Sequence, residues 1–380
     1  MTAMNKERPS PTQKLIGQRR ASSDIDPVIE LQRAKTLIEE FSHRKPFATS
    51  SLRELKQCYA EVCRSYYTIA AISRRRVLED VVRNEILRLL YPMRSRIERA
   101  ILADMSVVRD RSQIFIEATS RSFFGFSSKQ GVSIRYPLSV CAPTLECGGR
   151  CYAHDGRDRE LHLIFRGVLN LYCGLLFESG SATEREEILS ELTPTIRYAV
   201  KKSIDEARIA ADIGFAREPR IRFAHVGEMT ATPAFTNALA CEIKKMEPKV
   251  ACVIYTRHPD AKKLNPQLFR VNFTLDRADD RRRALAPYFA RIVSSAWDGK
   301  VSSDVDVNFL EHHVEKAAQI QGDGFACPVT VNHSSKPSCD VARCDICFRE
   351  RDGLSVTNPV RQKNFSGAGS SERVIILKYR

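Results

Sequence analysis

The chain has 380 residues, of which 43% are hydrophobic, so it can bury a substantial core and form about two domains. Its 60 lysines and arginines against 46 acidic residues give a formal net charge of +14, which favours polyanionic partners such as nucleic acid. The sequence has no apolar run of about 18 residues and no signal-peptide core, which argues against a membrane-spanning or secreted protein. We therefore expect a cytoplasmic protein with no membrane partner.

The N-terminal part of the chain is expected to be helical after a short tail. Residues 1–25 are basic and polar and predict a disordered tail. Apolar residues recur at helical spacing from Val28 to Phe41, and the capping box Ser51-Leu-Arg-Glu54 predicts a second helix. Two further apolar stripes predict helices on either side of Pro92, so we expect an all-helical domain over residues 26–115.

This helical domain is rich in arginine. Its arginines predict either contacts with the phosphates of a nucleic acid or the solvated side of a helical bundle. The residues concerned are Arg74, Arg75, Arg76, Arg83, Arg88, Arg94, Arg96 and Arg99.

The middle of the chain alternates between strand-like and helix-like segments. Six segments rich in β-branched and aromatic residues predict strands at 131–140, 220–225, 250–255, 268–275, 291–296 and 305–309. Helix signals lie between them, including a stripe from Leu161, a capping box at Thr183–Glu186, starts at Thr193-Pro194 and Thr232-Pro233, and a segment near 279–290. The alternation predicts an α/β fold with a partial (β/α)6 barrel over residues 116–322, whose functional face is the carboxyl-terminal rim.

Three cysteines, Cys141, Cys147 and Cys151, lie close together in the stretch CAPTLECGGRCYA after the first predicted strand. Cysteines crowded into one loop of an intracellular protein are better explained by a metal than by disulfides. Because the loop joins a strand to a helix, it is expected at the edge of the sheet where α/β proteins bind ligands. An iron–sulfur cluster, a zinc ion and the absence of any metal remain open for this loop.

A second group, Cys327, Cys339, Cys344 and Cys347, predicts a Cys-rich metal module over residues 323–380. Four thiolates with a terminal Cys-x2-Cys pair suit a tetrahedral zinc site or an auxiliary 4Fe–4S cluster. The remaining cysteines stand singly among apolar residues and are expected to fill the core: Cys58, Cys63, Cys173, Cys241 and Cys252.

Gly227 and Glu228 follow the second predicted strand. A glycine at such a position lets the backbone approach a ligand closely, and a carboxylate accepts hydrogen bonds from a ligand amine. The alternative is an ordinary turn with a solvent-exposed glutamate.

The order of these parts resembles the radical S-adenosylmethionine (SAM) superfamily over residues 131 to about 310. In that superfamily three cysteines hold a 4Fe–4S cluster, and the methionine end of SAM binds its fourth iron. The resemblance implies that Cys141, Cys147 and Cys151 are cluster ligands and that Gly227-Glu228 holds the amino group of SAM. It also implies that Asn272, Thr274 and Asp276 lie where a later strand meets the ribose or carboxylate of SAM.

More narrowly, the cysteine pattern is similar to that of the phage-associated "gene product 88" family. The pattern is Cys-x5-Cys-x3-Cys-Tyr-Ala, followed near the C-terminus by Cys-Pro and Cys-x4-Cys-x2-Cys-Phe. The loop differs from the usual Cys-x3-Cys-x2-Cys spacing of the SAM superfamily, and Tyr152 follows its last cysteine where the superfamily has an aromatic residue before it.

We therefore expect an iron–sulfur protein of radical SAM type that acts on a nucleic acid or a nucleotide, because its positive charge favours such substrates. The alternative is a non-enzymatic, metal-stapled nucleic-acid-binding protein, in which zinc or iron–sulfur groups serve the fold alone. Glu228 distinguishes the two functions, because only the enzyme needs it.

Overall fold

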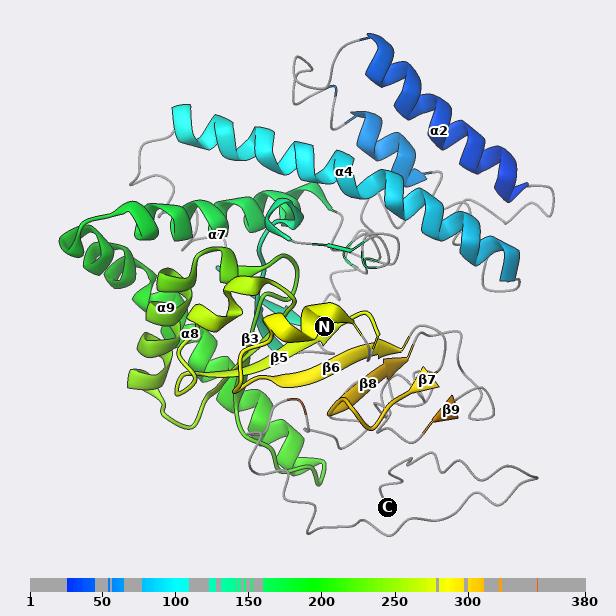
Figure 1. The fold of residues 1–380 in the computed structure, drawn as a ribbon. Helices are drawn as coiled ribbons and strands as arrows, with labels where there is room; N and C mark the ends of the chain where they lie inside the picture. The colour runs from blue at the N-terminus through cyan, green and yellow to red at the C-terminus, as the bar shows by residue number, and fades with distance from the viewer. Residues whose placement is uncertain are drawn as a thin grey trace, which may run out of the picture. The chain divides into compact units, whose positions relative to one another are not determined.

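The computed structural model describes residues 26–44, 54, 57–64, 77–108, 123–127, 131–141, 143–144, 147, 151, 153, 160–277, 280–296, 300–310, 321–322 and 347. The chain divides into two compact units, one of residues 1–97 with 148–154 and the other of residues 98–147 with 155–380. The described part of the first unit is helical, and the second contains a seven-stranded sheet (Figure 1). The predicted tail 1–25 and all of the predicted Cys-rich module except Cys347 lie outside the described residues.

The helices expected near the N-terminus are present where the structure describes them. α2 spans Pro27–Arg44, and residues 57–64 form part of another helix. Asp26 caps α2, because its Oδ1 accepts the backbone N–H of Val28 at 2.8 Å. None of the described helices combines the length and the apolar character that crossing a membrane requires.

α4 spans Val77–Val108 without interruption, so the predicted break at Pro92 is wrong. A proline inside a helix removes a backbone hydrogen bond and costs about 3 kcal/mol. Pro92 is exposed, while Leu90, Met93 and Ile97 are buried and continue one apolar stripe past it. Burying these side chains contributes roughly 1.5–3 kcal/mol each, which outweighs the cost of the proline.

The second unit contains a mixed α/β fold with a mostly parallel sheet, as the sequence predicts. The strand order is β1-β2-β3-β4-β5-β6-β8, and all neighbours are parallel except the β1–β2 pair. Among the described strands, β1 and β8 are the two ends of the sheet, so closure into a partial barrel remains a prediction. The bounds are β1 Phe124–Ser127, β2 Gly131–Ile134, β3 Arg220–Phe223, β4 Ala251–Thr256, β5 Phe269–Leu275, β6 Arg291–Ala296 and β8 Val307–Leu310.

Two details of the strands differ from the sequence predictions. β1 has no predicted counterpart, and the predicted strand 131–140 ends at Ile134, after which Leu138–Val140 forms the short helix η2. Pro137 lies beyond β2, at the start of this turn, so it does not disturb the pairing of β2 with its two neighbouring strands. A separate parallel pair is formed by β7 (Lys300–Val301) and β9 (Gln321–Gly322).

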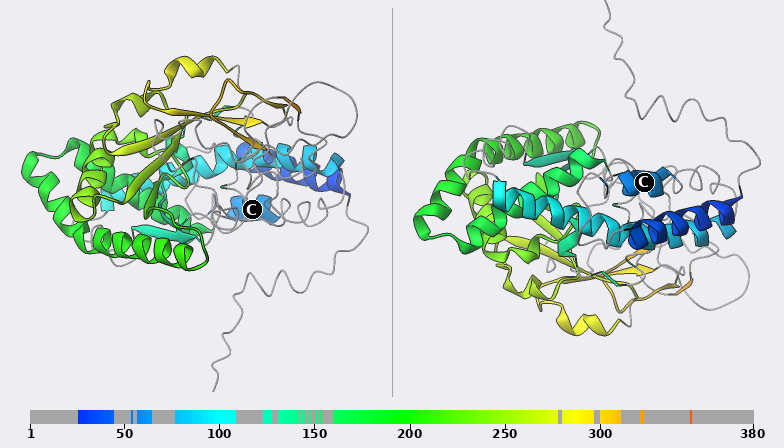
Figure 2. Two further views of the ribbon diagram at one scale, coloured as in Figure 1. Left: turned by 90° about the horizontal axis from the view of Figure 1, so that it is seen from below. Right: turned by 90° about the horizontal axis from the view of Figure 1, so that it is seen from above.

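Three long helices, α7 (Leu161–Ser179), α8 (Ala182–Asp212) and α9 (Pro233–Met246), gather on one side of the sheet (Figure 2). Phe235 of α9 is fully buried, and its ring centroid lies 5.5 Å from that of Phe177 on α7. Short 3-10 helices follow three of the strands: η5 (Met229–Ala231) precedes α9 after β3, whereas η6 (Pro259–Lys263) follows β4 and η7 (Arg281–Leu285) follows β5. η7 replaces the helix predicted near 279–290.

α8 is one helix, so the predicted new start at Thr193-Pro194 is wrong. Its buried stripe continues on both sides of the proline, as in α4. The capping box lies two residues before the predicted one: the hydroxyl of Ser181 accepts the N–H of Glu184 at 3.3 Å, and the Glu184 carboxylate accepts the N–H of Ser181 at 2.7 Å.

The opposite face of the sheet contacts the C-terminal part of the chain at Cys347. The side chain of Cys347 is buried in an apolar cluster with residues of three strands. Its backbone carbonyl accepts a hydrogen bond from Nδ2 of Asn272 at 2.9 Å. The strand residues of this cluster are Ala251, Val253, Val293 and Val307.

Tyr136, just after β2, is fully buried and ties the stem of the cysteine loop to the segment after β3. Its backbone N–H donates to the carbonyl of Val226 at 2.7 Å, and its hydroxyl lies 2.8 Å from the hydroxyl of Thr232. Burial raises the pKa of this phenol, so it stays protonated.

Glycines make room for Tyr136 on two sides. A Cβ added at Gly174 on α7 would lie 2.5 Å from the Tyr136 hydroxyl, and one added at Gly227 would lie 2.5 Å from the carbonyl oxygen of Tyr136. Gly227 also has a φ of +78°, a conformation that residues with a side chain rarely adopt.

Replacing Gly227 with alanine should lower the free energy of unfolding by about 2 to 4 kcal/mol, because the new Cβ would displace the backbone of Tyr136 in a left-handed conformation. Urea denaturation would measure the loss. The matched control is Gly125→Ala in β1, where an added Cβ would meet its nearest neighbour at 3.7 Å. That control should change stability by less than about 1 kcal/mol, and equal losses in the two variants would contradict the prediction.

Candidate functional site

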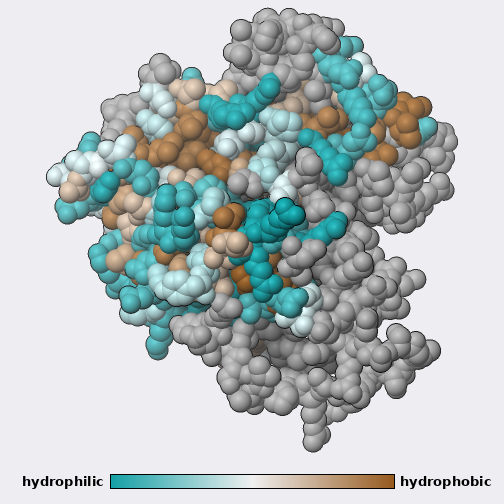
Figure 3. All heavy atoms as spheres, in the orientation of Figure 1, coloured by the Kyte–Doolittle hydropathy of each residue, from teal (hydrophilic) through white to brown (hydrophobic). Residues whose placement is uncertain are grey.

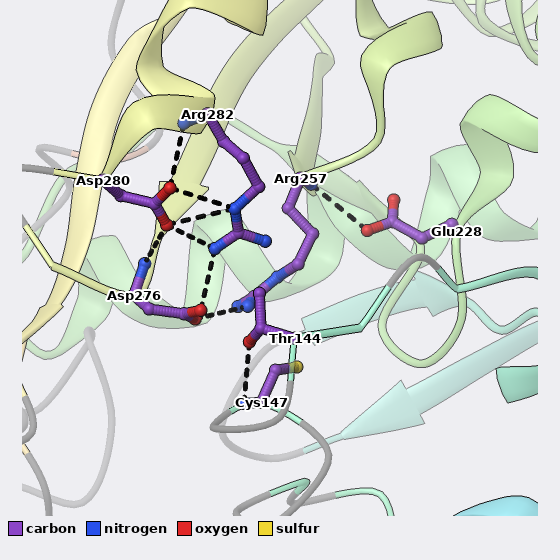
Figure 4. A network of polar contacts seen from close by, with 7 residues as sticks. All are labelled: Thr144, Cys147, Glu228, Arg257, Asp276, Asp280 and Arg282. Atoms are coloured by element: carbon purple, nitrogen blue, oxygen red, sulfur yellow. Dashed lines mark hydrogen bonds and ion pairs between the residues drawn. The ribbon is translucent and has the colours of Figure 1, made fainter.

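The candidate site lies at the carboxyl ends of the parallel strands. Glu228 follows β3, Arg257 follows β4 and Asp276 follows β5, and Cys147 lies in the loop after β2 (Figure 4). Parallel strands present their carboxyl ends at one edge of a sheet, which is why residues distant in sequence meet there. This edge is where the sequence predicts the site.

Glu228 is a buried carboxylate and not the solvent-exposed glutamate of an ordinary turn, since 5% of it is exposed. Its Oε2 accepts hydrogen bonds from the hydroxyls of Thr256 at 2.7 Å and Thr230 at 3.4 Å, and its Oε1 accepts the backbone N–H of Arg257 at 3.2 Å. Burial raises the pKa of Glu228, although these donors and the Arg257 charge lower it in part. A carboxylate has about four acceptor positions, so Oε1 can accept a further donor from a ligand.

Gly227 is needed here for a different reason from the one that the sequence suggests. The sequence predicts a close approach of the backbone to a ligand. In the structure a Cβ at Gly227 would instead meet the carbonyl oxygen of Pro137 at 2.6 Å and the backbone of Tyr136. Gly227 therefore holds the Glu228 turn against the stem of the cysteine loop.

A chain of alternating charges lies beside Glu228. Nη1 of Arg257 donates to Oδ1 of Asp276 at 2.7 Å, and Nη2 of Arg282 donates to Oδ2 of the same carboxylate at 2.8 Å. Nε of Arg282 also donates to Oδ1 of Asp280 at 3.1 Å. Hydrogen bonds from Arg282 lower the pKa of Asp280 to about 2, so this carboxylate is ionised at neutral pH.

Arg257 occupies the centre of this arrangement. Its side chain is 13% exposed and that of Asp276 is 6% exposed, so the two form a largely buried ion pair. Burial lowers the pKa of Arg257, but the negative groups of Cys147, Asp276 and Glu228 outweigh that effect and raise it. Arg257 therefore remains charged between the cysteine loop and the two acids.

Cys147 is the cysteine that the structure brings to these charges. Its backbone N–H donates to the hydroxyl of Thr144 at 3.0 Å, which fixes the loop locally. Burial raises the pKa of the Cys147 thiol, Arg257 lowers it, and Asp276 and Glu228 raise it. The thiol thus lies within electrostatic range of both Glu228 and Asp276.

The other two loop cysteines are half-buried. The N–H of Cys141 donates to the carbonyl of Leu138 at 3.0 Å at the end of η2, and Cys151 belongs to the first compact unit. Among the residues that the structure describes, no group of three histidines, cysteines or acids is arranged to hold a metal ion. The predicted ligands Cys327, Cys339 and Cys344 lie outside those residues.

No family model, curated protein or solved structure matches this chain.

Most of the single cysteines fill the core as predicted. Cys58, Cys63, Cys173 and Cys252 are buried, whereas Cys241 on α9 is half-buried. Burial raises the pKa of Cys173 and of Cys252 to about 12, so these thiols stay protonated. The three loop cysteines are less buried than these core cysteines.

The resemblance to the SAM superfamily implies that Asn272, Thr274 and Asp276, on or just after β5, contact the cofactor. These three residues have different surroundings in the structure. Asp276 belongs to the site, whereas Asn272 is fully buried and donates from Nδ2 to the carbonyl of Cys347 at 2.9 Å. Thr274 is half-buried, and strand alternation puts it on the same face of β5 as Asn272.

The N-terminal arginines are not all surface residues. Arg94 is 1% exposed, and its Nη1 donates to the carbonyl of Ala153 at 2.6 Å, so its assignment to a surface is wrong. Arg88 and Arg99 are exposed, and Arg96 is half-buried. Residues 74–76 lie outside the described part of the chain, as does the side chain of Arg83.

Sequence reasoning missed Arg257, Arg282, Asp280 and Thr256. Arg257 follows a predicted strand, as Glu228 does, and this position at a strand end could have marked it as a candidate site residue. Arg282 and Asp280 belong to a run of charges that is typical of an exposed helix, and only the fold reveals their pairing with Asp276.

Replacing Asp276 with asparagine should lower the free energy of unfolding by about 3 kcal/mol, because the change leaves two guanidinium groups against a neutral amide in a largely buried site. Chemical denaturation would measure the loss. The matched control is Asp205→Asn on α8, which removes an exposed ion pair with Arg208 at 3.4 Å and should cost less than about 1 kcal/mol. A loss at Asp276 no larger than the control would show that the charge chain does not stabilise the fold.

Proposed function

We propose that this protein binds a 4Fe–4S cluster through Cys141, Cys147 and Cys151 and binds SAM against Glu228, as an enzyme of radical SAM type. The observation that carries the proposal is the buried Glu228 carboxylate after β3, at the same edge of the sheet as the Cys147 loop that follows the neighbouring strand β2 (Figure 4). Two separate sequence signals, a cysteine loop after one strand and a Gly-Glu pair after the next, meet at one edge of one sheet.

The three loop cysteines fit the chemistry of such a cluster. They are the half-buried thiols of the loop, whereas the cysteines of the core are sealed and protonated. The positive charge of Arg257 favours a thiolate at Cys147 and thereby offsets part of the cost of its burial. When bound and reduced, the cluster and SAM supply a 5′-deoxyadenosyl radical that abstracts hydrogen from a substrate.

Glu228 fits the ammonium group of SAM. Its donors are two hydroxyls and one peptide N–H, which leave room on Oε1 for a cationic donor. Because the carboxylate is buried, its contact with an ammonium group is worth roughly 1.5 to 3 kcal/mol. Arg257 and Asp276 hold each other in place on one side of that carboxylate and keep the turn after β4 fixed.

The positive net charge favours a nucleic acid or a nucleotide as the substrate. The C-terminal cysteines, Cys327, Cys339, Cys344 and Cys347, are proposed to hold zinc or an auxiliary cluster, since four thiolates suit either.

Anaerobically purified protein should be brown and contain iron and acid-labile sulfide, and Cys147→Ala should lose the iron and the visible charge-transfer absorbance of one cluster. The matched control is Cys241→Ala, because Cys241 is also half-buried but lies on α9. It should retain the absorbance of the wild type. Zinc without iron after anaerobic purification would refute the cluster.

Glu228→Gln should weaken SAM binding about tenfold or more while the cluster absorbance is unchanged, because the amide keeps the size of the side chain but removes its charge. Calorimetry with cluster-loaded protein would measure the affinity. The control Glu242→Gln changes a glutamate on α9 and should bind SAM like the wild type. Reduced wild-type protein should release 5′-deoxyadenosine and methionine.

If cluster-loaded protein binds no SAM and Glu228→Gln changes nothing, the enzyme is excluded. The non-enzymatic, metal-stapled nucleic-acid-binding protein then becomes the better explanation of the cysteines and the charge.

A further inference from the structure

Exposed basic side chains gather on the turns that follow β4 and β5. Lys262 and Lys263 belong to η6, Arg277 follows β5, and Arg281 and Arg283 belong to η7. All five are exposed, and we refer to them together as the basic rim. Figure 3 shows hydrophilic residues gathered in the middle of its view, over the turns drawn in yellow in Figure 1.

The acids that the structure describes in the same turns are buried or half-buried. Asp276 is buried between Arg257 and Arg282, and Asp280 pairs with Arg282. Asp260 is half-buried and pairs with Lys263 at 3.1 Å. Arg257 and Arg282 thus neutralise Asp276 and Asp280, and Lys263 pairs with Asp260, so the described part of these turns retains a net positive charge at its surface.

An exposed aromatic residue accompanies the basic rim. Tyr288, three residues after η7, is 86% exposed, and its ring centroid lies 5.3 Å from that of Phe289. Leu285, the last residue of η7, is 45% exposed. The turn from β5 to β6 thus carries exposed cations and an exposed aromatic ring, the two kinds of side chain with which proteins bind unpaired bases.

The basic rim is joined to the candidate site by direct contacts. Arg282 lies between the rim residues Arg281 and Arg283 in η7, and its side chain bonds to Asp276. Asp276 in turn bonds to Arg257, which lies within electrostatic range of Cys147. A polymer lying on the rim would therefore pass beside the site.

We propose that the basic rim binds the phosphate backbone of a single-stranded nucleic acid and that Tyr288 stacks on one of its bases. This inference deepens the proposed function, because it names the macromolecule presented to that edge of the sheet. Five exposed cations match the regular charges of a polyphosphate chain, and each neutralised phosphate releases counterions. A single strand fits better than a duplex, since a duplex keeps its bases stacked and out of reach of Tyr288.

The test is fluorescence anisotropy of the full chain with labelled oligothymidylate and oligouridylate, each long enough to cover a site of about 4 to 16 nucleotides. A duplex of equal length is the third probe. Neither the cluster nor SAM is needed, so failure of this inference and failure of the proposed function are distinguishable. We expect tighter binding of the single strands than of the duplex, and the two single-strand arms decide between DNA and RNA.

The double variant Arg281→Gln/Arg283→Gln should weaken binding and reduce the salt dependence of log K by about 0.7 for each phosphate that the variant no longer neutralises. Lys262→Gln/Lys263→Gln should also weaken binding and reduce its salt dependence. The Arg283 change removes a hydrogen bond to the carbonyl of Asp304, so the lysine variant tests the rim independently if losing that bond disturbs folding. The matched control is Arg197→Gln/Arg208→Gln, which removes two exposed charges from α8.

Tyr288→Ala should weaken single-strand binding by about 5-fold to 150-fold, the range of one stacked base, while Tyr288→Phe should retain it. The control Tyr198→Ala removes a tyrosine of α8 that is 57% exposed and should leave affinity unchanged. Equal affinity of the rim variants and their controls would overturn the proposal. The proposal would also be overturned if Arg88→Gln/Arg99→Gln weakened binding and the rim variants did not. That result would place the nucleic acid on the N-terminal helices.

Discussion

Burial of Tyr136 is the constraint on which the site depends. The residue follows β2 and precedes the cysteine loop, and its hydroxyl contacts that of Thr232 at the start of α9. Its backbone pairs with Val226, immediately before the turn that carries Glu228. α7 can pack against it only because position 174 lacks a side chain. One fully buried side chain therefore sets the spacing between the cysteine loop, the acidic turn and two helices.

The charges at the strand ends are arranged so that most of them satisfy one another. Asp276 bridges Arg257 and Arg282, and Asp280 completes the second pair. Glu228 differs, because its bonds come from neutral hydroxyls and a peptide group. A buried carboxylate with neutral donors gains more from an incoming cation than one that already has a bonded guanidinium. This difference makes Glu228, and not Asp276, the acid suited to a ligand.

Much of the sheet and part of the site could be predicted from the sequence. Continuous apolar runs specify buried parallel strands, and the bounds of β6 match the prediction. Glu228 and Asp276 were found because each follows a strand, and parallel strands end at one edge. The prolines in α4 and α8 led to wrongly predicted helix boundaries. Whether a helix continues past a proline depends on how its buried apolar face packs against the rest of the fold. The pairing of Arg282 depends on the turn after β5, which the sequence predicts as a longer helix.

The packing of Cys347 against the sheet has a consequence for synthesis of the protein. The valines at 253, 293 and 307 are made well before residue 347 leaves the ribosome, yet that late residue helps to cover them. Until it arrives, this apolar face of the nascent sheet lacks one of its native neighbours. Exposed strands of this kind are prone to associate with other chains. This face of the sheet is thus expected to reach its native packing only after residue 347 has been synthesised.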